Sequence, residues 1–208
     1  MCGIAGYYGR KIIGVKNINS TAIRMRNRGP DNFAYERYNL NNNKILLLHS
    51  RLSIIELSSK ANQPILFKDQ VLIFNGEIYN YLELREKMIS KGIKFISNSD
   101  TEVLIKCLKF YGKKSFDMLE GMWAFALLDL KKNQLILSRD RFGEKPLYFK
   151  KTKSGIFFGS ETRFIEKLSG YDEQVNNQKI NEFLKYGFGS VFHDNNTFLQ
   201  NLRAIDPG

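Results

Sequence analysis

The sequence predicts one α+β domain, because short apolar segments typical of strands alternate along the chain with segments of helical periodicity. A length of 208 residues is enough for one domain with a sizeable core. Hydrophobic residues make up 43% of the chain and charged residues 25%, proportions that are ordinary for a globular protein. No repeat or low-complexity stretch divides the chain, so we assign residues 1–208 to a single domain.

The first half of the chain contains three apolar strand candidates and three helix candidates. We predict strands over 4–8, 45–49 and 71–74, and helices over 20–26, 79–91 and 101–111. The last helix has the clearest pattern, because Val103, Leu104, Cys107 and Leu108 recur at the spacing of one helix face. Cys107 lies on this apolar stripe and is therefore interpreted as a packing residue.

The second half is predicted to contain antiparallel strand pairs followed by helices. We predict strands over 122–128, 135–138, 147–150 and 156–159, and helices over 161–168 and 177–186. The polar turns at 129–133 and 151–155 join these strands into two hairpins, because each turn is short and flanked by apolar runs. Helices and antiparallel hairpins in one chain give the α+β class.

Composition argues against several functional classes. The formal net charge of +11 suggests nucleic-acid binding, but the lysines are scattered and no zinc spacing, RNA-binding aromatic motif or basic helix occurs. Two cysteines do not form a disulfide framework. No signal peptide and no apolar run of membrane-spanning length is present. We expect a cytoplasmic protein that binds neither nucleic acid nor membrane.

Cys2 directly follows Met1 and is the strongest candidate for a nucleophile. Methionine aminopeptidases remove the first residue when the second is small, and removal would leave a thiol and an α-amine on one residue. A thiolate is a nucleophile, and an α-amine with a pKa of roughly 7.7 to 8.0 can accept and return a proton near neutral pH. The small residues Gly3 and Gly6 let other backbone approach this end of the chain.

The Asn75-Gly76 pair follows an apolar strand and has two interpretations. Asn-Gly is the strongest short signal for a hairpin turn. A helix is predicted next, however, and a strand-to-helix turn could present the Asn75 carboxamide and the Gly76 N–H to one point. Those are two donors of the kind that an oxyanion requires during acyl transfer. The local sequence supports both interpretations equally.

Asp100 and Arg51 are candidates for binding a charged ligand. Residues Ser99 to Glu102 match a capping box, with Ser99 as the N-cap and Glu102 three positions later. This leaves the Asp100 carboxylate in the first helical turn, where it either favours the helix N-terminus or faces a cation such as an α-ammonium group. Arg51 ends an apolar strand, and is either a solvated cation or, beside a cleft, a bidentate partner for a carboxylate.

Seven motifs occur in the order that characterises one known family. They are Met1-Cys2-Gly3-Ile4-Ala5-Gly6, Arg28-Gly29-Pro30-Asp31, His49-Ser50-Arg51-Leu52-Ser53-Ile54, Asn75-Gly76-Glu77-Ile78-Tyr79-Asn80, Ser99-Asp100-Thr101-Glu102, Asp140-Arg141-Phe142-Gly143-Glu144-Lys145-Pro146-Leu147-Tyr148 and Ser160-Glu161. Together they resemble the glutaminase domain of glutamine-hydrolysing asparagine synthetases, which are class II, N-terminal-nucleophile glutamine amidotransferases. Each motif alone is weak, but the ordered set is specific and covers most of the chain.

The resemblance implies a fold and a reaction. The fold is a four-layer αββα sandwich of two antiparallel sheets, similar to N-terminal-nucleophile hydrolases. In the implied reaction, Cys2 Sγ attacks the side-chain amide of glutamine while its own α-amine moves the proton, and water then hydrolyses the γ-glutamyl thioester. The Asn75 Nδ2 group and the Gly76 N–H would hold the oxyanion.

The resemblance also implies how the substrate glutamine would be bound. Arg51 would bind the α-carboxylate, and Asp100 and Glu77 would bind the α-ammonium group. The remaining substrate-binding positions are Leu52, Ser53, Ile54 and Ile55. No metal or organic cofactor is expected for this half-reaction.

The same family carries a C-terminal ATP-dependent synthetase domain, for which ATP and Mg are expected. Its Ser-Gly-Gly-Xaa-Asp-Ser phosphate loop does not occur in this sequence, and residues from about 190 to 208 resemble the linker into that domain. We therefore expect part of a two-domain enzyme, with the synthetase domain as partner and a homodimer as one compatible state. The alternatives are a stand-alone glutaminase subunit for a sugar or other carboxylate amidotransferase, and a non-catalytic regulatory module that retains Met1. The ammonia acceptor is not identified by the sequence.

Overall fold

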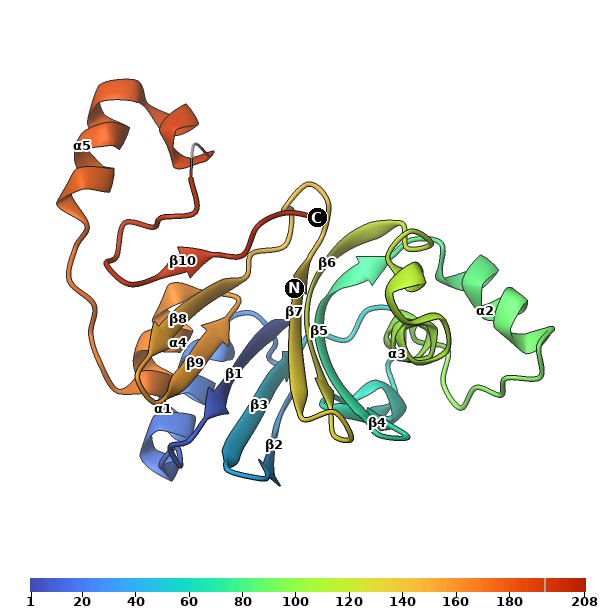
Figure 1. The fold of residues 1–208 in the computed structure, drawn as a ribbon. Helices are drawn as coiled ribbons and strands as arrows, with labels where there is room; N and C mark the ends of the chain where they lie inside the picture. Colours follow the sequence, from blue (N-terminus) through green and yellow to red (C-terminus); the bar gives the residue numbers. More distant parts are fainter. Residues whose placement is uncertain (193) are drawn as a thin grey trace.

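Two antiparallel sheets packed face to face form the centre of the computed structural model, which describes residues 1–192 and 194–208 (Figure 1). Sheet A contains, in spatial order, β10 (Arg203–Ala204), β8 (Tyr148–Thr152), β9 (Gly155–Gly159), β1 (Gly3–Gly9), β3 (Asn43–Arg51) and β2 (Asn32–Leu40). Sheet B contains β4 (Ile65–Phe67), β5 (Gln70–Ile78), β6 (Gly121–Asp129) and β7 (Gln134–Arg139).

Helices cover the outer face of each sheet and complete four layers (Figure 1). Sheet A is covered by α1 (Val15–Met25) and α4 (Thr162–Ser169), and sheet B by α2 (Tyr81–Ile89) and α3 (Asp100–Tyr111). Short 3-10 turns lie at Ser59–Ala61 and Gly112–Ser115. This αββα arrangement confirms the fold that the motif resemblance implied.

The three interfaces between the layers are filled by alternate residues of the strands. In β1, Ile4 faces sheet B, while Ala5 and Tyr7 face α1 and α4. In β5, Val71 and Ile73 face sheet A, whereas Leu72 and Phe74 pack under α2 and α3. Because side chains alternate along a strand, one face of each sheet can pack on the other sheet and the opposite face on helices.

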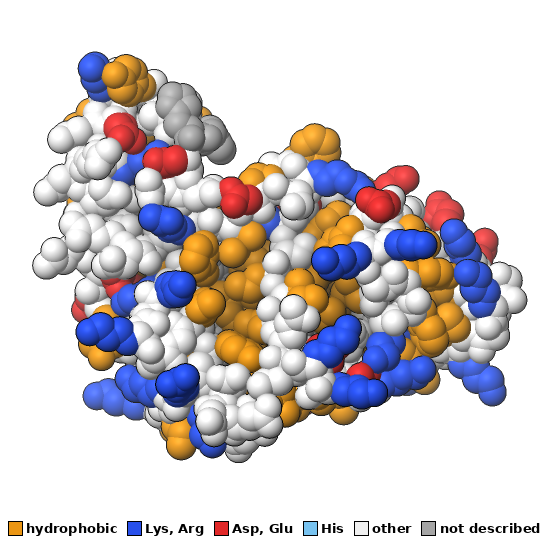
Figure 2. All heavy atoms as spheres, viewed as in Figure 1, with side chains coloured by type: hydrophobic (Ala, Val, Ile, Leu, Met, Phe, Trp, Pro, Cys, Tyr) orange, Lys and Arg blue, Asp and Glu red, His pale blue; other side chains and the backbone are white. Residues whose placement is uncertain are grey.

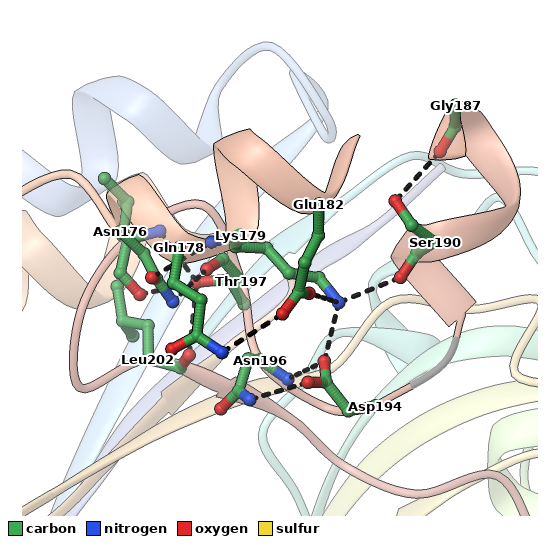
Figure 3. A network of polar contacts seen from close by, with 11 residues as sticks. Asn176, Gln178, Lys179, Glu182, Gly187, Ser190, Asp194, Asn196, Thr197 and Leu202 are labelled. Carbon is green, nitrogen blue, oxygen red and sulfur yellow. Dashed lines mark hydrogen bonds and ion pairs between the residues drawn. The ribbon is translucent and has the colours of Figure 1, made fainter. Parts of the chain in front are cut away.

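A C-terminal segment extends from the sandwich and carries α5 (Asn177–Tyr186) and a 3-10 turn over Phe188–Phe192. Its helix is anchored by Lys179, whose buried Nζ atom lies 2.7 Å from Asp194 Oδ1 and donates to the Ser190 carbonyl at 2.9 Å (Figure 3). Glu182 approaches the same ammonium group at 3.6 Å. A buried cation needs such partners because burial removes its hydration.

Most predicted elements are present, with shifted ends. The helix over 177–186 matches α5, and the two predicted hairpins correspond to the β6–β7 and β8–β9 pairs. The first helix begins at Val15 rather than at residue 20, and strands β2, β4 and β10 were not predicted. Lys and Arg side chains are spread over the visible face rather than gathered in one stripe (Figure 2).

The predicted end of the third strand at Asn75-Gly76 is wrong. Strand β5 continues to Ile78, and Asn75 and Gly76 pair with Ala124 and Trp123 of β6. They therefore form neither a hairpin turn nor a strand-to-helix turn. Gly76 is required because the backbones approach closely: a Cβ atom there would lie 2.3 Å from the Met122 carbonyl oxygen.

Candidate active site

A cavity of about 110 Å³ lies where β1 begins and where β3 and β5 end. Of the ten site residues predicted from the sequence, nine line it: Cys2, Arg51, Leu52, Ile54, Ile55, Asn75, Gly76, Glu77 and Asp100. Ser53 is not part of the wall; its backbone N–H donates to Asp31 Oδ2 at 2.7 Å. Segments far apart in the sequence thus converge on one small space.

The Cys2 thiol is held at this cavity by the strand-end backbone opposite it. The Leu52 N–H donates to Sγ at 3.4 Å, and the thiol lies 3.6 Å from the Leu52 carbonyl oxygen. Burial raises the pKa of the Cys2 thiol above its ordinary value, and the Leu52 N–H and Arg51 counter this only in part. A thiol in this state is neutral near pH 7, so its use as a nucleophile requires a nearby proton acceptor.

The Arg28-Gly29-Pro30-Asp31 motif fixes the backbone around Cys2. Arg28 Nε donates to the Cys2 carbonyl at 2.9 Å, and its Nη1 atom pairs with Glu161 Oε1 at 3.1 Å. Gly29 packs against the end of β3, where a Cβ atom would lie 2.4 Å from backbone atoms of Ser50. The two motifs at Arg28 and Glu161 therefore meet at the N-terminus.

Asn75 presents an unused donor to the cavity. Its side chain is 1% exposed, and its Nδ2 atom is buried without a hydrogen-bond partner in the part of the chain that the structure describes. A buried amide group left unpaired costs about 1 to 3 kcal/mol, so such groups in native proteins require an explanation. A ligand oxygen in the cavity would provide the missing acceptor.

The strand that carries Asn75 is braced from both sides. Gln63 Oε1 accepts a hydrogen bond from the Phe74 N–H at 2.6 Å, and His49 Nε2 lies 3.1 Å from the Phe74 carbonyl oxygen. Burial lowers the pKa of His49 to about 3, so the ring is neutral and can donate through Nε2. These contacts fix the position of β5 next to Cys2.

Asp100 forms the acidic wall of the cavity. Its carboxylate accepts a hydrogen bond from the Ile78 N–H at 3.1 Å, and burial raises its pKa to about 6 although this bond opposes the shift. Ser99 caps α3 as predicted, accepting from the Glu102 N–H. Glu102 does not complete the capping box, because its carboxylate instead accepts from the Ile96 and Ser97 N–H groups.

Arg51 is buried and organises the loop that closes the cavity. Its Nη1 atom donates to the Ser58 carbonyl at 2.8 Å and to Asn62 Oδ1 at 2.7 Å, and Nη2 donates to the Glu56 carbonyl. The interpretation of Arg51 as a solvated strand end is therefore wrong. The loop from 52 to 62, named here the Arg51 loop, is held around this guanidinium.

Several further residues of the cavity wall were not predicted from the sequence, and two of them make contacts that bear on the site. Gln63 braces β5 and also reaches Thr101 of α3, with Nε2 3.4 Å from the Thr101 hydroxyl. Lys145 is 6% exposed, contacts Met1 and lines the same cavity as Cys2. The motif around Asp140 contained Lys145, but nothing in the local sequence shows that this segment folds back to the N-terminus.

Across residues 1–192 and 194–208, no group of three or more His, Cys, Asp or Glu side chains is arranged to hold a metal ion. Among the same residues, no helix combines the length and apolar character needed to cross a membrane.

Comparison with known proteins shows a family that matches the whole chain. The model of the glutamine amidotransferase domain matches residues 1–208. Asparagine synthetase [glutamine-hydrolyzing] 1 of Bacillus subtilis is 30% identical over 215 residues, covering 100% of this chain and 33% of that protein. A relative from Methanocaldococcus jannaschii, whose name carries the words asparagine synthetase [glutamine-hydrolyzing], is 36% identical over 90% of this chain and 40% of its own length.

A solved structure shows the same fold at lower identity. Glutamine phosphoribosylpyrophosphate amidotransferase from B. subtilis, complexed with ADP and GMP, superposes with a TM-score of 0.67 at 20% identity, over 84% of this chain and 45% of that chain. This similarity shows the fold alone. The chain spans about a third of the length of the curated B. subtilis relatives that it matches.

Proposed function

This chain belongs to the glutamine amidotransferase domain family, and we propose that it hydrolyses the side-chain amide of glutamine to glutamate and ammonia through a thioester on Cys2. The observation that carries the proposal is the buried, unpartnered Asn75 Nδ2 group in the same cavity as the Cys2 thiol. A nucleophile and an unused donor at one cavity are the two parts that acyl transfer requires.

The reaction balances with groups of the chain and one water. After removal of Met1, the Cys2 α-amine accepts the thiol proton as Sγ bonds to the δ-carbon of the glutamine side chain, and the carbonyl oxygen becomes an oxyanion held by Asn75 and Gly76. The C–N bond then breaks, and the amine returns the proton to the departing ammonia. Water attacks the thioester next, which releases glutamate and restores the thiol.

The walls of the cavity suit the charged end of glutamine. Asp100 and Glu77 supply carboxylates for the α-ammonium group, and the Arg51 guanidinium supplies a cation for the α-carboxylate. Arg51 is already bonded to its loop, so binding a carboxylate would exchange some of those partners. Leu52, Ile54 and Ile55 would line the rest of the site.

For the full-length protein we extend the proposal to ammonia transfer. The curated relatives named asparagine synthetase are about three times longer than this chain. The ammonia would pass to an ATP-dependent amidation in a synthetase part, with aspartate as acceptor and Mg with ATP as cofactor. A glutaminase serving another acceptor and a non-catalytic module that retains Met1 are the competing functions.

The test is glutamate release by the processed chain and by Cys2→Ala. Mass spectrometry first establishes that Met1 is absent, and circular dichroism shows that the variant is folded. We expect Cys2→Ala to lose glutamate release entirely, because no other group can form the thioester, whereas Cys107→Ala keeps it. The glutamine mimic 6-diazo-5-oxo-norleucine should label Cys2 and spare Cys107, which is buried and whose thiol pKa burial raises to about 11. Undiminished glutamate release by Cys2→Ala would disprove the proposal.

A further inference from the structure

Lys145 is a buried cation at the cavity that the reaction above does not use. Its side chain is 6% exposed, and its Nζ atom lies 3.2 Å from the Sδ atom of Met1. Among the described residues, no carboxylate lies within 4.0 Å of this ammonium group. The partner that it does have belongs to Met1, the residue whose removal frees the Cys2 α-amine.

The position of Lys145 is set by the loop that follows β7. Asp140 is fully buried and its carboxylate accepts from the backbone N–H groups of Trp123, Phe142, Glu144 and Lys145. The Lys145 carbonyl accepts from Arg139 Nε at 2.8 Å. The backbone of Lys145 is thus held at both its N–H and its carbonyl, so its side chain is directed to the cavity by a rigid loop.

The contrast with Lys179 shows that this arrangement is unusual within the protein. Lys179 is buried to a similar degree, but its ammonium group contacts Asp194, Glu182 and a backbone carbonyl (Figure 3). Burying a charge without an anionic partner is costly, and structural lysines avoid it. Lys145 therefore needs a role beyond packing.

We propose that the Lys145 ammonium group holds the freed α-amine of Cys2 in its neutral, proton-accepting form. This inference rests on the proposed function, because it concerns the base of that reaction. A positive charge beside an amine disfavours protonation of the amine. In this role the lysine acts through Cys2 rather than on the substrate. Met1, while it remains attached, occupies the space beside Nζ.

Other charged groups at the cavity also affect the protonation of the Cys2 amine. Arg28, which donates to the Cys2 carbonyl and is paired with Glu161, adds positive charge beside Cys2, and Arg51 adds positive charge from the end of β3. Glu77 on β5, Asp100 on α3 and Glu56 in the Arg51 loop add negative charge when ionised. These carboxylates favour a protonated amine, and the Lys145 ammonium group adds to the cations that oppose them.

A direct test measures the titration of the Cys2 amine in the full processed chain. Labelling with ¹³C,¹⁵N-cysteine gives signals from only Cys2 and Cys107, and alkylating the Cys2 thiol with iodoacetamide removes its coupled titration. We expect Lys145→Gln to raise the amine pKa by about one pH unit. Lys145→Arg should keep the wild-type value. Lys151→Gln, which removes an exposed lysine and the same net charge, should also keep it.

A second readout is the pH profile of glutamate release. With Lys145→Gln, the acid limb of kcat/KM should move up by about one pH unit, a loss of about four-fold at pH 7 that disappears near pH 9. An unchanged amine pKa in Lys145→Gln overturns the inference, as does an equal change in Lys151→Gln. A loss independent of pH, or a rise in KM alone, would assign Lys145 to packing or to substrate binding and also overturn it.

The two measurements separate this inference from the proposed function. The amine titration needs no turnover, so it tests Lys145 even in a chain that does not hydrolyse glutamine. If glutamine is hydrolysed and the amine pKa is the same in wild type and Lys145→Gln, the inference fails alone. If Lys145→Gln does not fold, Lys145→Met is measured in the same way.

Discussion

The two walls of the cavity differ in how their polar groups are satisfied. On the β5 wall, Asn75 Nδ2 has no partner among the described residues. On the opposite wall, the Arg51 guanidinium is already bonded to the carbonyls of Ser58 and Glu56 and to the side chain of Asn62. The β5 wall therefore has a donor without a hydrogen-bond partner, whereas the charged group of the opposite wall already has partners within the protein.

This difference separates the proposed chemistry from recognition. A donor on a central strand between β4 and β6 cannot move to find another acceptor, so it is preorganised for charge that develops during a reaction. A guanidinium held by loop carbonyls can exchange those partners for a substrate carboxylate, and the loop then adjusts. The rigid wall suits transition-state stabilisation and the loop wall suits substrate binding.

The strongest test of the comparison is Asn75→Ala. We expect kcat for glutamine hydrolysis to fall by about 10²- to 10³-fold with little change in KM, because the donor acts on charge that appears after binding. Asn75→Asp, which keeps the shape and loses the donor, should fall similarly. Steady-state kinetics check both variants. A large rise in KM at unchanged kcat would place Asn75 in ground-state binding instead.

The loop wall is tested by Arg51→Ala. We expect KM for glutamine to rise by about 30-fold or more, because truncating a buried, hydrogen-bonded charge costs about 2 to 5 kcal/mol. Backbone amides of the Arg51 loop should also exchange faster with solvent, while Cys2 still reacts with a small neutral alkylating agent. Lys60→Ala, an exposed cation in the same loop, is the control. Unchanged KM with faster exchange would leave Arg51 with a structural role only.

Asp100→Asn is expected to weaken glutamine binding less than Arg51→Ala does, and to increase the stability of the fold at neutral pH. Folding raises the Asp100 pKa from 3.8 to about 6, so the folded state holds a proton more tightly and unfolding free energy falls as pH rises from about 4 to 6. Asn avoids this cost, so the variant should be more stable at pH 7 by up to about 3 kcal/mol, with no such gain at pH 4.

Asp100→Asn should also weaken glutamine binding. Losing one charged hydrogen-bond acceptor should raise KM for glutamine by about ten-fold. Melting temperatures at pH 4 and pH 7, together with KM at pH 7, check both parts. A lower melting temperature at pH 7 with unchanged KM would show that Asp100 serves the helix N-terminus rather than the substrate.

The sequence predicted best those helices whose ends are set by capping residues close to them in the chain. Helix α5 begins after the Asn176 cap and ends before Gly187, and α3 begins after the Ser99 cap. These helix ends can therefore be predicted from residues next to them in the sequence. Strand β2 was missed because it lies at the edge of sheet A, half-exposed and rich in polar residues, and its place depends on pairing with β3. Its aromatic residues Phe33, Tyr35 and Tyr38 were the available signal.

At the site, too, contacts between distant parts of the chain could not be predicted from the local sequence. The ordered motifs identified nine residues that line one cavity, but local sequence suggested a turn at Asn75-Gly76 where the structure has a strand. The Asn-Gly turn signal is outweighed by pairing with β6, where close approach at Met122 requires a glycine. Lys145 was missed because its neighbour Met1 is 144 residues away in the sequence.

The Arg51 loop has a consequence for how such a protein can diversify. It lies outside both sheets and is held by the Arg51 guanidinium and by hydrogen bonds to Asp31 and Asn98, whereas Asn75 and Gly76 belong to a central strand. Changes of length or composition in the loop therefore leave the strand register intact. Apart from Leu52, which contacts the Cys2 thiol, the loop can therefore change without moving Asn75 or Gly76, so a change in the amide substrate would require changes in one segment only.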